Sequence, residues 1–323
     1  MNLIEFGDCR QTMRMWKDRG VQAQMCVTSP PYFGLRDYGH EGQIGLEQTP
    51  EQYIAAMVEV FRCVRDVLAD DGTLWVNIGD SYAAAGGAQV QGTKQTKGSQ
   101  AGAWNGETRK PPPGIKQKDL IGIPWLLAFA LRADGWYLRQ DIIWHKPNPM
   151  PESVRDRCTK AHEYLFLLSK SERYFFDSEA MKEPAVGNAS GAAASFKRNG
   201  SKREQTIPGQ GYGTHRPERE DVAYNETRNR RSVWTVATRH YKGAHFATFP
   251  PALIEPCILA GSRPGDIVLD PFMGSGTTAQ VALQHGRQYL GCELNPAYGD
   301  LQQQRISAVV HVANSPTLEF LLS

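Results

Sequence analysis

Residues 267–285 constrain the fold of this 323-residue chain more than any other segment. They begin with the short apolar run Ile267–Asp270, which is typical of a buried strand. The turn Gly274-Ser275-Gly276 and a helical pattern from Thr277 follow directly. A strand, a glycine turn and a helix N-terminus in this order let backbone N–H groups approach a ligand closely. The segment therefore predicts a cofactor site in an α/β protein.

The residues around this turn discriminate between classes of cofactor. A phosphate-binding P-loop needs Lys after its last glycine, but Thr277 follows Gly276, which excludes that class. A dinucleotide-binding turn has a third glycine where this chain has Ala279, so that alternative is weakened. The next apolar run, residues 288–292, ends at Glu293, whose carboxylate can accept hydrogen bonds from both hydroxyls of a ribose. A surface carboxylate is the alternative for Glu293 taken alone.

The rest of the chain alternates short β-rich segments with helical ones. Residues 50–69 and 123–132 have helical spacing, and Thr49 is an N-cap candidate for the first helix. Strands are expected over residues 3–6, 24–28, 73–79, 137–144, 164–169, 267–270 and 288–292. Strands separated by helices predict a parallel sheet that is covered on both faces.

The net charge of +2 conceals an uneven distribution. Residues 84–118 carry +5 and residues 195–245 carry +6, which leaves −9 for the remainder. Two basic segments on an acidic body favour a polyanionic partner, because phosphate contacts dominate nucleic-acid affinity. Solvated basic loops are the equally weighted alternative. Residues 84–118 are rich in Gly, Gln, Lys and Pro and predict a mobile loop, whereas residues 184–245 predict an insertion with little core of its own.

Cysteine spacing and hydropathy exclude several other classes. The six cysteines form neither a CxxC pair nor a His/Cys ligand pattern, so we expect neither a disulfide framework nor a metal site. The N-terminus lacks an apolar signal region, and the longest apolar run, residues 123–131, is too short to cross a bilayer. We expect a soluble, cytoplasmic protein with no membrane partner.

The second chemical motif is Thr28-Ser29-Pro30-Pro31-Tyr32, which follows an apolar strand. Two consecutive prolines lack backbone donors and hold a stiff turn, which leaves the Pro30 carbonyl free to face a ligand. Ser29 adds a hydroxyl acceptor and Tyr32 adds a ring face. Two acceptors and an aromatic platform suit a planar base that carries an NH2 group, although a purely structural turn is the alternative for this motif alone.

With both motifs in this order, the chain resembles the β-class DNA amino methyltransferases of the Ser-Pro-Pro-Tyr type, in which the catalytic motif precedes the cofactor motif Asp-Pro-Phe-Met-Gly-Ser-Gly. The resemblance implies a circularly permuted Rossmann-like α/β fold with a seven-stranded, mostly parallel sheet. It divides the chain into a catalytic half (1–183), an inserted target recognition region (184–245) and an S-adenosylmethionine-binding half (246–323). Residues 71–80, 144–163 and 246–251 also resemble segments of this family.

The resemblance implies roles for particular residues. Asp8 would accept a hydrogen bond from the adenine amine of the cofactor, which is S-adenosylmethionine. The implied cofactor-binding residues are Asp8, Thr28, Phe249, Asp270, Pro271, Phe272, Gly274, Ser275, Gly276, Thr277 and Glu293. The implied catalytic residues are Ser29, Pro30, Pro31 and Tyr32.

The expected reaction is direct, in-line methyl transfer to an exocyclic amine of a base that is flipped out of duplex DNA. In this family Ser at position 29 accompanies cytosine N4 more often than adenine N6, so cytosine-N4 methylation is expected and adenine-N6 methylation is the alternative. A non-catalytic nucleic-acid-binding protein with a relic cofactor fold is a more distant alternative.

Basic side chains are expected to hold the DNA backbone. The candidates are Lys94, Lys97, Lys146, Lys197, Arg198, Arg228, Arg230 and Arg231. Double-stranded DNA is thus the expected partner, and the family also admits a cognate restriction endonuclease that shares the target site.

Overall fold

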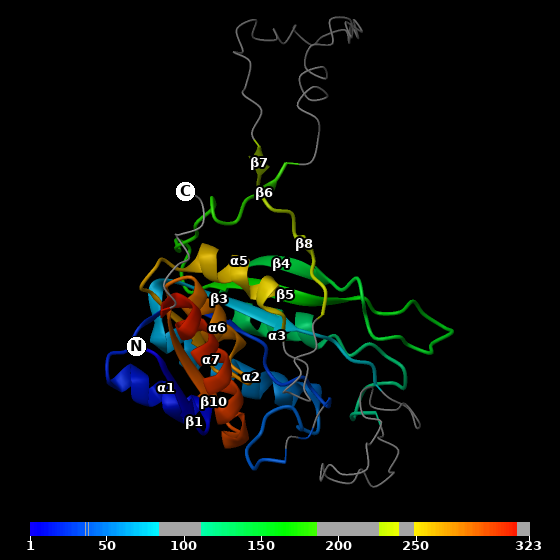
Figure 1. Cartoon of the computed structure of the whole chain (residues 1–323). Coiled ribbons are helices and arrows are strands. Elements are labelled where there is room, and N and C mark those ends of the chain that lie inside the picture. The colour runs from blue at the N-terminus through cyan, green and yellow to red at the C-terminus, as the bar shows by residue number, and fades with distance from the viewer. Residues whose placement is uncertain (36, 38, 84–110, 186–225, 239–248, 315–323) are drawn as a thin grey trace, which may run out of the picture. The chain divides into compact units, whose positions relative to one another are not determined.

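The computed structural model describes residues 1–35, 37, 39–83, 111–185, 226–238 and 249–314, which belong to two compact units (Figure 1). The larger unit comprises Met1–Ala180 and Arg231–Ser323, and the smaller unit comprises Met181–Arg230. Most of the expected basic loop, residues 84–110, lies outside the described residues.

One eight-stranded sheet runs through the larger unit in the order β1-β10-β9-β2-β3-β5-β4-β8. Its strands are β1 (Leu3–Phe6), β2 (Ala23–Thr28), β3 (Leu68–Ile78), β4 (Tyr137–His145), β5 (His162–Ser169), β8 (Val233–Thr235), β9 (Ile267–Asp270) and β10 (Gln288–Glu293). Neighbouring strands are parallel except at β5, which is antiparallel to β3 and β4. The expected mostly parallel sheet is confirmed, with short β8 as an edge strand beyond the seven expected.

The order of the strands confirms the circular permutation. β1, at the start of the chain, pairs with β10 near its end, and β9 pairs with β2 through Met25 and Val268. The last two strands of the chain therefore lie between its first two. Because β1, β10, β9 and β2 are all parallel, their carboxyl ends meet at one edge of the sheet.

Helices cover both faces of the sheet (Figure 1). The helices are α1 (Cys9–Asp18), α2 (Pro50–Val67) and α3 (Ile123–Ala133) on one face, and α5 (Pro251–Gly261), α6 (Thr277–Gln284) and α7 (Gly299–Asn314) on the other. Side chains alternate along the strands, so Cys26 and Leu74 join the α1–α3 core whereas Met25 and Trp75 face the other side. This two-sided burial explains why the strands are apolar on both faces.

α2 begins as its sequence predicts. The hydroxyl of Thr49 accepts a hydrogen bond from the N–H of Gln52 at 3.3 Å, and Pro50 occupies the first helical position. The helix ends at Val67, two residues before the expected boundary, because Leu68 already pairs with Ala23 of β2.

The range expected to form the insertion contains parts of both units. In the smaller unit, β6 (Glu183–Pro184) pairs antiparallel with β7 (Thr227–Arg228). β8 also lies within residues 184–245, but it pairs with β4 in the main sheet, and Trp234 on β8 is buried. The main sheet therefore includes a strand from within this range. Across the described ranges, we find no helix with the length and apolarity needed to span a membrane.

Candidate active site

A cavity of about 590 Å³ opens at the carboxyl ends of β1, β2, β9 and β10, a size typical of small-molecule sites. The expected residues that line it are Asp8, Ser29, Pro30, Pro31, Tyr32, Phe249, Pro271, Phe272, Gly274, Ser275, Thr277 and Glu293. Both sequence motifs thus contribute to one cavity, although they lie about 240 residues apart.

Glu293 and the glycine turn form part of the cavity lining. The Glu293 carboxylate accepts hydrogen bonds from the backbone N–H groups of Gly274 at 2.7 Å and Asn295 at 2.8 Å. Burial raises the pKa of the Glu293 carboxyl above its ordinary value. Ser275 also lines the cavity, and its buried hydroxyl has no hydrogen-bond partner within the described residues. This region therefore offers polar groups with spare hydrogen-bonding capacity.

Asp270 lies beneath the turn and outside the lining. It is 1% exposed, and its carboxylate accepts hydrogen bonds from the hydroxyls of Thr28 and Thr278, each at 2.6 Å, and from the N–H of Phe272 at 3.0 Å. Burial raises the pKa of Asp270 to about 6 despite these bonds. Thr28, Asp270 and Gly276 are not among the residues that line the cavity, and the Asp270 network supports the turn from below. Their expected contacts with the cofactor stay predictions.

Helix α7 braces the same turn through two residues that sequence reasoning missed. The side chain of Gln302 donates a hydrogen bond to the Gly274 carbonyl at 2.7 Å, and Arg305 donates one to the Thr277 hydroxyl. Both side chains are buried, and their spacing of three places them on one helix face. Two polar residues at this spacing were the available signal, but the sequence does not indicate which turn they face.

Asp8 lines the cavity and is paired with Arg10. Its carboxylate caps α1 by accepting the Arg10 N–H at 2.8 Å, and the Arg10 guanidinium pairs with it at 2.6 Å. The hydrogen bonds from the Arg10 side chain hold the pKa of the Asp8 carboxyl below its ordinary value. Any ligand amine at Asp8 would therefore share an ionised carboxylate with Arg10.

The proline motif leaves β2 and forms another part of the lining. Tyr53 on α2 anchors the motif, because its buried hydroxyl donates a hydrogen bond to the Pro31 carbonyl at 2.8 Å. In the described part of the chain, the Pro30 carbonyl accepts no hydrogen bond, as the missing proline N–H groups predict. This carbonyl and the Ser29 hydroxyl are therefore two acceptors in the cavity lining.

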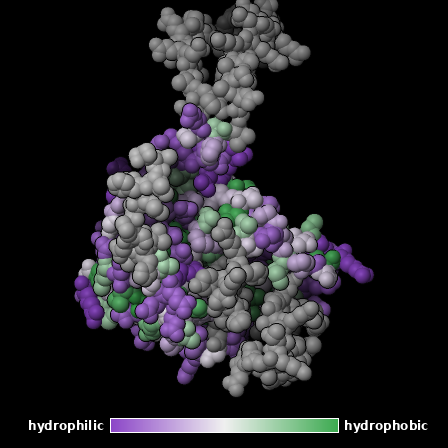
Figure 2. Space-filling view, in the orientation of Figure 1, coloured by the Kyte–Doolittle hydropathy of each residue, from purple (hydrophilic) through white to green (hydrophobic). Residues whose placement is uncertain are grey.

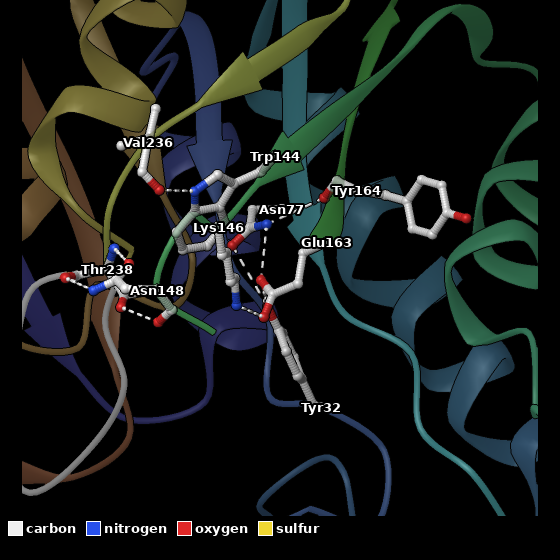
Figure 3. Close-up of polar contacts among 9 residues, drawn as sticks. All are labelled: Tyr32, Asn77, Trp144, Lys146, Asn148, Glu163, Tyr164, Val236 and Thr238. Carbon is white, nitrogen blue, oxygen red and sulfur yellow. Dashed lines mark hydrogen bonds and ion pairs between the residues drawn. The ribbon is translucent and has the colours of Figure 1, made fainter. Parts of the chain in front are cut away.

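A polar cluster surrounds the hydroxyl of Tyr32 (Figure 3). This hydroxyl donates a hydrogen bond to Oε2 of Glu163 at 2.8 Å, and the same oxygen accepts a hydrogen bond from the Asn77 amide at 3.3 Å. Oε1 of Glu163 pairs with the Lys146 ammonium. Burial, followed by the Glu163 charge, raises the pKa of Tyr32 well above its ordinary value. Tyr32 therefore stays protonated and acts as a donor.

Four of the eight expected DNA-binding residues lie within the described part of the chain. Lys94, Lys97, Lys197 and Arg198 lie outside the described residues. Lys146 lies in the cavity lining and pairs with Glu163, and Arg228 pairs with Glu183 within the smaller unit at 2.9 Å. Arg230 belongs to the smaller unit, and the exposed Arg231 belongs to the larger unit.

Among the described side chains, no group of His, Cys, Asp and Glu is arranged to hold a metal ion. On the face seen in Figure 2, the described residues at the surface are a mixture of polar and apolar ones.

Comparison with known proteins identifies the family. A family model described as DNA methylase, for N6 and N4 methyltransferases, matches residues 23–304. The chain is 47% identical to the Type II methyltransferase M.Cfr9I of Citrobacter freundii over 93% of this chain and 86% of the relative. It is 46% identical to the Type II methyltransferase M.SmaI of Serratia marcescens over 94% of this chain and 90% of the relative.

Two solved structures share the fold. The PvuII DNA methyltransferase, described as cytosine-N4-specific, has a TM-score of 0.59 at 18% identity, over 97% of this chain and 91% of that one. A putative DNA modification methylase of Thermus thermophilus, complexed with S-adenosylmethionine, has a TM-score of 0.57 at 21% identity, over 96% and 95% of the two chains. The chain therefore belongs to the S-adenosylmethionine-dependent DNA methylase family, whose members methylate exocyclic amines of cytosine or adenine.

Proposed function

We propose that this DNA methyltransferase transfers the methyl group to the N4 amine of cytosine. The observation that carries the proposal is the lining of the cavity, in which Ser29, Pro30 and Tyr32 share one space with Glu293 and the glycine turn. Two acceptors suit the two protons of an amine, and the tyrosine ring suits a planar base. Ser at position 29, which in the family that the chain resembles accompanies cytosine N4 more often than adenine N6, favours cytosine.

The residues present fit the cofactor. Each oxygen of the Glu293 carboxylate accepts one hydrogen bond from the backbone, which leaves lone pairs for the two ribose hydroxyls. The Ser275 hydroxyl, which has no partner among the described residues, offers a further polar contact, and the Phe249 and Phe272 side chains supply apolar lining for an adenine ring. When bound, S-adenosylmethionine supplies an electrophilic methyl group on a sulfonium centre.

The chain's own residues would align the amine for direct attack. Ser29 and the Pro30 carbonyl would accept hydrogen bonds from the two N–H groups of the amine of an extruded cytosine. These two bonds would direct the nitrogen lone pair toward the methyl group of the bound cofactor. Tyr32 would stack on the base and offset part of the cost of flipping it. No covalent enzyme intermediate is needed, because the amine is itself the nucleophile. Burial raises the pKa of Cys9 to about 12 and that of Cys26 well above its ordinary value, so neither thiol is activated as a nucleophile.

Nucleoside mass spectrometry tests the choice of base. The purified protein is incubated with unmethylated duplex DNA and the cofactor, and the DNA is then digested to nucleosides. N4-methylcytosine is the expected product. N6-methyladenine as the sole product would contradict the proposal and establish the adenine alternative.

Ser29→Ala is expected to lower kcat about tenfold, because one of the two acceptors for the amine is lost. The Kd for DNA should change less than about twofold, since the phosphate contacts are untouched. Single-turnover methylation and DNA binding at one salt concentration measure the two effects. Ser171→Ala, at an exposed hydroxyl that bonds the Asp70 carbonyl, is the control. An unchanged kcat for Ser29→Ala would contradict the assigned role.

Gly79→Ala is expected to lower kcat about fivefold to tenfold by displacing Tyr32. A Cβ at Gly79 would lie 2.8 Å from Cε2 of Tyr32 and 3.3 Å from the Glu163 carboxyl carbon, so the ring must move. Gly299→Ala is the matched control, because its Cβ would meet Phe6 at an ordinary 3.4 Å. Methylation rates of both variants, at matched thermal stability, check the prediction. Equal rates would show that the ring position is unimportant.

We further propose that residues 184–245 contribute target recognition and that the basic residues expected from the sequence, other than Lys146, hold duplex DNA. The charge of this range supports the assignment, because its Lys and Arg residues outnumber its acids. The similarity to two Type II methyltransferases supports a partnership with a restriction endonuclease that shares the target site. Sequencing that detects modified bases, in DNA from cells that express the protein, would give the target site.

A further inference from the structure

We propose that Lys146 and Glu163 form a positioning pair that fixes the Tyr32 ring in the orientation needed to stack on the target base. Neither residue is required to touch the reacting atoms. The proposal rests on the proposed function, in which Tyr32 is the platform for the base. It gives Lys146, expected from its charge to contact DNA phosphate, a different role.

Asn77 fixes the Glu163 carboxylate, which in turn holds the Tyr32 hydroxyl. Asn77, on the central strand β3 and 2% exposed, donates hydrogen bonds to the Tyr164 carbonyl at 3.1 Å and to Oε2 of Glu163 at 3.3 Å. Because Asn77 belongs to a buried strand, it ties the carboxylate to the core of the sheet. The Tyr32 hydroxyl then meets an acceptor at a fixed position, 2.8 Å away.

Lys146 supplies the positive charge that compensates the Glu163 carboxylate in the lining of the cavity. The Lys146 and Glu163 side chains are only 18% and 17% exposed, and a single unpaired charge at such burial is unfavourable. The Lys146 ammonium also lies 4.3 Å from the centre of the Trp144 ring, whose N–H donates to the Val236 carbonyl at 2.8 Å. The short segment after β8 therefore holds the indole that supports the pair (Figure 3).

The pairing follows from strand register. Trp144 on β4 lies opposite Glu163 on β5, so Lys146, two residues further along, is a diagonal neighbour of Glu163 on the same face. The Tyr32 ring is then held at two places. Glu163 accepts a hydrogen bond from its hydroxyl, and the flank of the ring lies so close to Gly79 that no side chain fits between them. A ring restrained at both places presents its face in one orientation, which lowers the entropy lost when a base stacks on it.

Three variants at two positions test the pair. Lys146→Met leaves a buried carboxylate without its countercharge, and Glu163→Gln leaves an unpaired ammonium. Each is expected to lower the single-turnover rate about tenfold to thirtyfold, while the Kd for S-adenosylmethionine changes less than about threefold. The double variant K146M/E163Q removes both charges and keeps an amide oxygen for the Tyr32 hydroxyl, so its rate should return to within about threefold of wild type.

Tyr32→Phe shows whether the pair acts through Tyr32. This variant has no hydroxyl for Glu163 to hold, so adding Lys146→Met to it should lower the rate by less than about twofold more. Lys17→Met is the matched control, because it breaks an exposed ion pair with Asp66 between α1 and α2. This control should change neither the rate nor the Kd. Thermal melting of every variant separates loss of folding from loss of positioning.

Two results would overturn the proposal. One is a double variant whose fold-loss in rate equals the product of the two single fold-losses, which would mean that the two residues act independently. The other is a Lys146→Met effect that stays about tenfold in the Tyr32→Phe background. All rates are measured as labelled methyl groups incorporated into DNA, whichever base receives them. If mass spectrometry then finds only N6-methyladenine, the choice of cytosine fails, while the comparison between variants still decides the role of the pair.

Discussion

Replacing Asp270 by alanine is expected to lower the free energy of unfolding by about 3–5 kcal/mol. The change would leave three donors in the core without their acceptor, namely the hydroxyls of Thr28 and Thr278 and the N–H of Phe272. Each buried donor left unpaired costs about 1–3 kcal/mol. Asp270→Asn should cost only about 1–2 kcal/mol, because one oxygen stays and the Thr278 hydroxyl can rotate to accept from the new amide.

Urea unfolding of both variants measures these losses. Asp66→Ala is the control, since Asp66 is half-exposed and its ion pair with Lys17 lies on the surface. A loss below about 1 kcal/mol for Asp270→Ala would show that water replaces the carboxylate and that the buried network is unimportant.

The pH dependence of the same measurement tests the environment of Asp270. Its pKa is raised from 3.8 to about 6 in the folded protein, so the folded state binds a proton more tightly than the unfolded state. The contribution of this group to stability is therefore greatest below about pH 4 and declines as the pH rises to about 6, by roughly 2–3 kcal/mol. Asp270→Asn should lack this decline. Parallel curves for wild type and Asp270→Asn between about pH 4 and 6 would contradict the raised pKa.

Glu293→Ala is expected to raise the Kd for S-adenosylmethionine about 100- to 1,000-fold. The variant loses the carboxylate that would accept two ribose hydroxyls, and it frees the N–H groups of Gly274 and Asn295 that shape the wall. At about 1.5–2 kcal/mol each, two hydrogen bonds to a charged acceptor are together worth about 3–4 kcal/mol, which corresponds to this range. Titration calorimetry of the purified protein with the cofactor measures the Kd directly.

Matched variants separate this effect from a general loss of structure. Glu293→Gln keeps one acceptor oxygen and should weaken cofactor binding about tenfold. Glu255→Ala, which removes the partly exposed hydrogen-bonded contact with His285 at the C-terminal end of α6, should leave the Kd unchanged. If Glu293→Ala binds the cofactor within about fivefold of wild type, the assignment of Glu293 to the ribose is wrong.

Local patterns in the sequence determined much of the fold and most of the site. β1 and β9 have the expected bounds, because burial on alternate faces leaves an apolar signal in each segment. The other expected strands are present within two residues of their expected bounds, except that β3 begins at Leu68, five residues before its expected start. The glycine turn and the Ser29–Tyr32 motif were also readable, since each is a short run whose backbone preferences do not depend on distant residues. Both line the cavity as expected.

Only the tertiary structure decided what surrounds these motifs. The sequence around Asp270 indicates only a polar residue at the end of a strand, whereas the tertiary structure shows that β2, 242 residues away in sequence, brings the Thr28 hydroxyl onto its carboxylate. Lys146 reads as a phosphate contact from its charge, yet the β4–β5 register places Glu163 beside it. The charge and spacing of a residue are local properties. Its partners are set by which strands pair and in which register, and that depends on contacts across the whole sheet.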